Sequence, residues 1–252
     1  MIIDAHAHVS ATTYGSTENY LAQLAQAGIG QGVVCAGGML DVRKMNAYID
    51  GKIRPAAVPR NDYVEQAVDA HPELYGVVCV DPRDPRATEI AERYLSRGFR
   101  GLMVSPLIHG FSFADDVLAP LVALCGEHEA PIYSHVAFRR GANTPDYVAL
   151  ARRFPRTRFI LEHMGATPAD HEATAAAVEL DNLFLETSLG NYQHILGTVK
   201  EAGASKVLFG SEYPLSHPAA EVQKIHLLPI SEGEREKILS GNIRELLRLE
   251  RA

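Results

Sequence analysis

Short runs of apolar and β-branched residues alternate with segments of helical period along the whole chain. The runs lie at residues 1–9, 32–36, 76–80, 99–104, 131–135, 158–163, 183–187 and 206–210. Strands that are separated by helices indicate repeated βα units and a parallel sheet. The pattern therefore predicts an α/β protein with eight parallel strands.

Helix ends are marked in several of the intervening segments. Thr144 followed by proline is typical of an N-cap before the first helical position, and this predicts a helix over 144–153. Ser231 and Glu234 have the spacing of a capping box at the start of another helix. Gly28 and Gly203 are typical of helix C-termini.

Polar residues interrupt the first apolar run at every second position. Asp4, His6 and His8 would point the same way, because side chains on a strand alternate between its two faces. Two histidines at this spacing can bind one metal ion, although a strand with two hydrogen-bonded core histidines has the same pattern. In a barrel such a site would lie at the C-terminal end of the strand.

The length of the chain favours one barrel. A (β/α)₈ barrel has about 250 residues, and the chain has 252. We find no linker and no internal repeat, so we predict a single domain over residues 1–252 with near-minimal barrel length. Two small domains are the alternative that length alone leaves open.

Charge and composition limit the classes of function. The formal net charge is −7 and no block of basic residues occurs, which argues against a nucleic-acid surface. No apolar run approaches the roughly 18 residues of a membrane span, and no secretory signal is visible. Cys35, Cys79 and Cys125 form no CxxC pair, so we interpret them as core residues of a protein from the reducing cytoplasm.

Five polar side chains fall at the predicted C-terminal ends of strands: His6, His8, His135, His163 and Glu212. Imidazole and carboxylate donors without a nearby thiolate suit Zn²⁺, with Mn²⁺, Co²⁺, Ni²⁺ and Fe²⁺ as competitors. A catalytic zinc lowers the pKa of its water to about 7, and a neighbouring carboxylate or histidine can then move protons.

Four motifs in the same order resemble the amidohydrolase-related family, in the branch that includes aminocarboxymuconate-semialdehyde decarboxylase. They are D-A-H-A-H at 4–8, F-P-R-T-R-F-I-L-E-H-M-G at 154–165, L-F-G-S-E-Y-P at 208–214 and I-L-S-G-N-I-R-E-L-L at 238–247. The resemblance implies a distorted (β/α)₈ TIM-type barrel with one divalent metal ion. By position it makes His6, His8 and His135 metal ligands, and His163 a residue that polarises water or substrate.

Two departures from the family pattern bear on the site. Glu212 stands where the family usually has aspartate, so we expect it to be a further ligand or to bind the metal's water. Met103 and Ser105 replace the lysine and histidine that often occur on the fourth strand. Because no lysine is available there as a bridging ligand, a single metal ion is expected, with zinc as the first choice.

Three classes of function follow from these residues. The first is a metal-dependent hydrolase of a small molecule that uses a metal-activated water, with Glu212 and His163 as the catalytic residues. The second is a lyase of the same family, a decarboxylase or hydratase acting on a carboxylated substrate. The third, a barrel that only binds, is disfavoured because all four strand-end histidines are present.

Two arginines after the fifth strand indicate the substrate. Arg139 and Arg140 lie on the loop just after the fifth strand and His135, and arginine binds carboxylates in bidentate geometry, so we expect one of them to bind a small carboxylated substrate. Two solvated loop arginines are the alternative. No nucleic acid or membrane partner is expected, and a homodimer is left open.

Overall fold

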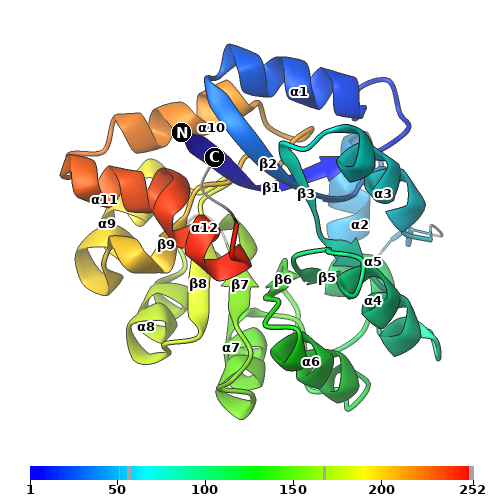
Figure 1. Cartoon of the computed structure of the whole chain (residues 1–252). Helices are drawn as coiled ribbons and strands as arrows, with labels where there is room; N and C mark the ends of the chain where they lie inside the picture. Colours follow the sequence, from blue (N-terminus) through cyan, green and yellow to red (C-terminus); the bar gives the residue numbers. More distant parts are fainter. Residues whose placement is uncertain (51, 56–57, 167–168, 250–252) are drawn as a thin grey trace.

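The computed structural model describes residues 1–50, 52–55, 58–166 and 169–249. It shows a ring of parallel strands surrounded by helices (Figure 1). The strands are β1 Ile2–Val9, β2 Ile29–Ala36, β3 Leu74–Gly76, β4 Val78–Cys79, β5 Leu102–Val104, β6 Ile132–Ser134, β7 Phe159–Leu161, β8 Leu183–Glu186 and β9 Val207–Leu208. They pair in the order β1-β2-β3 and β4-β5-β6-β7-β8-β9, and every pair is parallel.

The two sheets are joined into one ring at both of their edges. Only Val77 separates β3 from β4, and its N–H donates to the carbonyl of Val34 on β2. The N–H of Val78 on β4 donates instead to the carbonyl of Gly101, just before β5, at 3.0 Å. One extended segment therefore serves both sheets. Since β3 and β4 together take one place in the ring, nine short strands fill the eight places of a barrel.

Backbone hydrogen bonds between β1 and the segment that follows β9 close the ring. The N–H of Ala5 donates to Phe209 at 2.9 Å, and the N–H of His8 donates to Tyr213 at 2.7 Å. Ala7 and Tyr213 form a parallel bridge. The predicted (β/α)₈ barrel is thereby confirmed.

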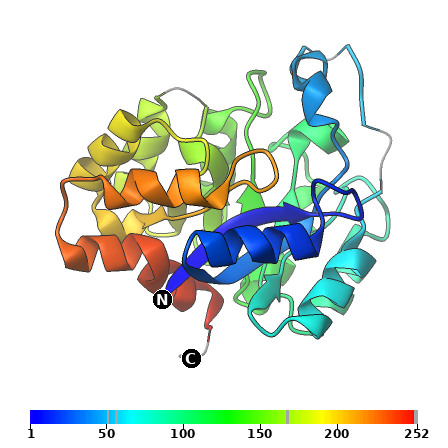
Figure 2. The ribbon, with the colours of Figure 1, turned by 90° about the horizontal axis from the view of Figure 1, so that it is seen from above.

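Helices cover the outside of the ring, and Figure 2 shows that α2 lies apart from them, beyond the strand ends. The helices are α1 Thr17–Gln26, α2 Met45–Ile49, α3 Asn61–Ala70, α4 Ala87–Leu95, α5 Pro106–His109, α6 Leu118–Glu127, α7 Thr144–Arg153, α8 His171–Glu179, α9 Tyr192–Ala202, α10 Pro218–His226, α11 Glu232–Glu236 and α12 Asn242–Leu247. Buried apolar side chains from strands and helices form one continuous core. None of the helices in the described ranges combines the length and the apolarity that crossing a bilayer requires.

The predicted helix ends are largely confirmed. Ser231 and Glu234 form the expected capping box, and Gly28 and Gly203 have positive φ angles next to helix C-termini. The N-cap of α7 was predicted one residue too late. Asn143 caps this helix, because its side chain accepts from the backbone and completes a capping box, while Thr144 donates its hydroxyl to Asp170 instead.

All eight predicted strands are present, but several end earlier than the apolar runs. The sixth run was predicted to reach residue 163, whereas β7 ends at Leu161 and Glu162–Met164 form a single 3₁₀ turn. His163 has φ +59°, in the left-handed region. This turn points His163 into the mouth of the barrel, as a simple strand end would not.

Candidate metal centre and active site

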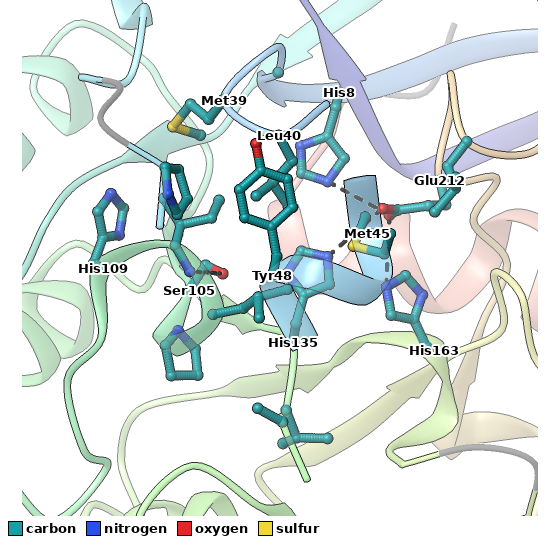
Figure 3. A pocket seen from close by; sticks show the side chains of 18 of the residues that line it. His8, Met39, Leu40, Met45, Tyr48, Ser105, His109, His135, His163 and Glu212 are labelled. Carbon is teal, nitrogen blue, oxygen red and sulfur yellow. Dashed lines mark hydrogen bonds and ion pairs between the residues drawn. The ribbon is translucent and has the colours of Figure 1, made fainter. Parts of the chain in front are cut away.

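The C-terminal ends of the strands bring the five predicted polar side chains together. His6 and His8 lie on β1, His135 follows β6, His163 follows β7 and Glu212 follows β9. Figure 3 shows four of them on one side of a cavity, with Glu212 facing the histidines. Donor atoms of His6, His8, His135 and Glu212 all lie within 4.8 Å of one another, which suits a single metal ion.

The Nε2 atoms of all four histidines approach the carboxylate of Glu212. Oε2 of Glu212 lies 3.2 Å from His6 Nε2, 3.5 Å from His8 Nε2 and 3.8 Å from His163 Nε2. Oε1 lies 3.7 Å from His135 Nε2. The arrangement therefore presents four ring nitrogens and one carboxylate to the same small volume.

The other ring nitrogen of each histidine faces a fixed partner. Such a partner selects the tautomer and orients the ring, which leaves Nε2 free for a ligand. Nδ1 faces Glu186 Oε2 in His6 (3.1 Å), Cys35 Sγ in His8 (3.1 Å) and Ser188 Oγ in His163 (2.9 Å), while in His135 it lies 3.0 Å from Glu162 Oε2 without an aligned hydrogen bond.

Asp4 fixes the segment that carries Glu212. Its carboxylate accepts from the backbone N–H of Ser211 at 2.8 Å, from the Ser211 hydroxyl at 2.5 Å and from the Tyr20 hydroxyl at 2.8 Å. Glu212 itself donates its N–H to the carbonyl of His6 and has φ +56°. Strained backbone of this kind persists only where its surroundings determine it, and it is frequent at functional sites.

Two buried carboxylates of the site were missed by the sequence analysis. Glu162 and Glu186 are both fully buried, and both contact His6. Glu186 ends β8, so its position at a strand end was an available signal. Glu162 precedes His163, and strand alternation would place these neighbours on opposite faces; the turn after β7 brings both inward.

Burial and neighbouring charges separate the pKa values of the site. Burial raises the pKa of Glu162 to about 7, because the ionised carboxyl has left water. Burial acts in the same direction on Glu212, but His6 and His8 outweigh it and hold the pKa of that carboxyl well below its usual range. Burial lowers the pKa of His135 and of His163, so both imidazoles are neutral at neutral pH.

The residues present fit a divalent cation. Four buried carboxylates lie in or beside the cluster, and within the described residues none of them contacts lysine or arginine; they are Asp4, Glu162, Glu186 and Glu212. Both oxygens of Glu162 and Oε2 of Glu212 are buried without an aligned hydrogen bond. Buried carboxylates at this density favour positive charge, which a divalent cation among the imidazole nitrogens would supply.

A cavity of about 600 Å³ opens above the cluster. Figure 3 shows the cluster on one side and Ser105 and His109 on the opposite side. Apolar side chains make up much of the wall between them, among them Met39, Leu40, Met45, Ile108 and Phe138. The cavity can therefore enclose a small molecule with an apolar body next to the cluster.

The structure separates the two arginines that were predicted to bind substrate. Arg139 lines the cavity, but its guanidinium donates to the carbonyls of Pro106 and Phe111 at 3.2 and 3.0 Å. Arg140 is exposed and is not among the described residues that line the cavity. Arg54, which the sequence analysis missed, lines it and has no ion-pair or hydrogen-bond partner within the described residues.

The sequence model of the amidohydrolase family matches residues 3–249. This chain belongs to the amidohydrolase family. It is 24% identical to a γ-resorcylate decarboxylase from Polaromonas sp. strain JS666, over 76% of this chain and 76% of that protein. The family is one of enzymes, and its match confirms the predicted resemblance.

Two solved structures have a similar fold. A dihydroxybenzoic acid decarboxylase from Polaromonas sp. JS666, with bound manganese and 2-nitroresorcinol, is 19% identical with a TM-score of 0.68, over 100% of this chain and 98% of that one. A probable 2-pyrone-4,6-dicarboxylic acid hydrolase from Acinetobacter baumannii, with citric acid bound, is 15% identical with a TM-score of 0.72, over 98% and 99%.

Proposed function

We propose that this amidohydrolase-family protein is a metal-dependent hydrolase of a small carboxylated ring compound. The observation that supports hydrolysis is the carboxylate of Glu212, which stays ionised among the Nε2 atoms of the histidines. An ionised carboxylate in this place accepts protons. Hydrolysis needs such an acceptor, because the attacking water must lose a proton as it bonds to carbon.

We assign one divalent ion, zinc, to His6, His8, His135 and Glu212. Imidazole-rich sites suit zinc, and manganese is the principal competitor because carboxylate oxygens suit it. Bound there, the ion would supply the positive charge that lowers the pKa of a water molecule to about 7.

His163 orients the water. Its Nδ1 faces the hydroxyl and the carbonyl of Ser188, and that hydroxyl already donates to Glu186 at 2.7 Å. Nδ1 must therefore carry the proton, and Nε2 is left as an acceptor 3.8 Å from Glu212. His163 accepts one hydrogen of the water while Glu212 removes the other.

Arg54 is our candidate for binding the substrate carboxylate, in place of Arg139 and Arg140. The guanidinium of Arg139 already donates to two backbone carbonyls, and Arg140 is exposed and is not among the described residues that line the cavity. A carboxylate bound by Arg54 would leave the ring of the substrate against the apolar wall, with its reacting bond toward Glu212.

Decarboxylation is the second candidate, and the curated relative favours it. An apolar cavity favours loss of carbon dioxide, since a carboxylate is poorly solvated there. In this reaction Glu212 would have to deliver a proton to the ring carbon. The low pKa of the Glu212 carboxyl disfavours that role in the protein without an ion.

The zinc-loaded protein distinguishes the two reactions when it is assayed with 2-pyrone-4,6-dicarboxylate and with 2,6-dihydroxybenzoate. We expect the pyrone ring to open, which is measured as a loss of its absorbance. We expect no release of carbon dioxide from either compound. Release of carbon dioxide without hydrolysis would replace our first candidate by the second.

Arg54→Met should raise KM by about 10–100-fold, which corresponds to the free energy of one hydrogen bond to a charged group. Arg140→Met serves as the control.

A further inference from the structure

Glu162 is the buried group of the site that the proposed function leaves without a role. Its side chain is fully buried, and both carboxylate oxygens lack an aligned hydrogen bond within the described residues. Oε1 lies 3.2 Å from Nε2 of His6, and Oε2 lies 3.0 Å from Nδ1 of His135. The carboxylate thus spans two histidines that we assign as metal ligands.

Glu186 is a carboxylate of the same site whose oxygens do have hydrogen-bond partners. It is equally buried, but it accepts from the backbone N–H and the hydroxyl of Ser188 and faces Nδ1 of His6. Glu186 therefore approaches His6 from the ring nitrogen that points away from the ion. Glu162 approaches the opposite nitrogen, Nε2, which is the one left free for a metal.

Glu162 and Glu212 share that free nitrogen. Each places a carboxylate oxygen 3.2 Å from Nε2 of His6. Two buried carboxylates that converge on one imidazole repel each other, and positive charge placed between them relieves that repulsion. A divalent ion would balance both negative charges.

We propose that Glu162 is a member of the metal-binding group: its Oε1 binds the ion directly, and its Oε2 orients His135. This inference rests on the metal dependence in the proposed function. It makes the ligand set three imidazoles and two carboxylates. Carboxylate oxygen suits manganese and imidazole suits zinc, so Glu162 raises the affinity for Mn²⁺ relative to that for Zn²⁺.

The test compares Zn²⁺ and Mn²⁺ affinities of the full-length wild type and Glu162→Gln by competition with a chelator of known affinity. We expect both affinities to fall by at least about tenfold in the variant, and that for Mn²⁺ to fall further. Unchanged affinities would overturn the proposal. An equal loss for both ions would also overturn it, because a residue that only orients His135 would produce that result.

A matched control separates this effect from the loss of any buried acid. Glu221 is buried and paired with Lys224 and Ser216, and Glu221→Gln should leave both metal affinities unchanged. If Glu162→Gln does not fold, Glu162→Ala with added formate serves instead, and formate should restore affinity by replacing the missing carboxylate. No restoration would count against the proposal. A wild type that binds no metal would refute the proposed function itself, which is a different outcome.

Discussion

The chemistry of each site histidine depends on the residue behind it. The sequence motifs identify His163 and His6 as site residues. They do not identify Ser188 and Glu186, which face the Nδ1 atoms of these histidines and fix their tautomers. The motifs predicted which histidines meet, because strand ends of a parallel barrel share one edge. They did not predict Glu162, because the left-handed turn at His163 reverses the alternation on which such predictions depend.

Glu212→Gln tests the proton acceptor. The amide keeps the shape of the side chain but cannot take a proton, so kcat of the metal-saturated variant should fall by at least about 100-fold, while the thermal midpoint of unfolding of the metal-free protein changes little. Steady-state kinetics and thermal unfolding measure the two effects. Glu212→Asp is the comparison, because it keeps the acid and should retain more activity than the amide. Turnover near that of the wild type in Glu212→Gln would remove this residue from the mechanism.

His109 should make the protein sensitive to mild acid. Its ring nitrogens are buried without a hydrogen-bond partner within the described residues. Burial lowers the pKa of His109, and the effect of Arg83 in the same direction is opposed by that of Asp81. The unfolded chain therefore takes up a proton near pH 6.5 while the folded protein does not, so stability falls as the pH drops below about 6.5.

His109→Leu removes this titration. Urea unfolding at about pH 7.5 and about pH 5.5 should show a smaller loss of stability toward acid in the variant than in the wild type. The variant should keep its metal affinity, since His109 lies across the cavity from the cluster. Equal losses in the two proteins would show that His109 titrates normally in the fold.

At the scale of elements, strand identity and order were predictable and strand ends were not. The apolar runs located each strand, because a buried strand needs apolar side chains wherever it lies in the ring. The division of one run into β3 and β4 had no sequence signal, since it follows from the change of partner at Val77. Arg54 was overlooked for a related reason: it lies far from any strand end.

Asn61 stabilises the junction between the two sheets. Its side-chain amide donates to the carbonyl of Cys79 at 2.7 Å, and its oxygen accepts from the N–H of Cys79 at 2.8 Å. Asn61→Ala leaves both backbone groups of β4 unpaired in a buried place. The free energy of unfolding should fall by about 1–3 kcal/mol, measured by urea denaturation.

The neighbouring Asp62 provides the control for that variant. It is exposed and pairs with Arg60, so Asp62→Asn should change stability little. Metal affinity should be unaffected in both variants, because Asn61 acts on the edge of β4 and not on the histidines. A loss as small in Asn61→Ala as in the control would mean that the junction does not depend on this amide.

At the scale of the whole molecule, closure of the ring determines the site. Backbone hydrogen bonds between β1 and the segment after β9 bring His6 next to Glu212. These two are the first and the last of the five predicted site residues along the chain. Asp4 contributes to the same closure through Ser211. An ion bound by β1 and by the segment after β9 would therefore stabilise the fold as well as serve the reaction.

Metal removal should lower the stability of the whole protein. An ion that binds only the folded state, at 100 times its Kd, adds about 2.7 kcal/mol to the free energy of unfolding. For a protein of this length that corresponds to a Tm about 5–10 °C higher than that of the chelated protein, measured by calorimetry. His6→Ala is the control: it removes a central ligand, so chelator should no longer lower its Tm. An equal Tm for the loaded and the chelated wild type would show that the ion does not join the two ends of the ring, and the buried carboxylates would then need another source of positive charge.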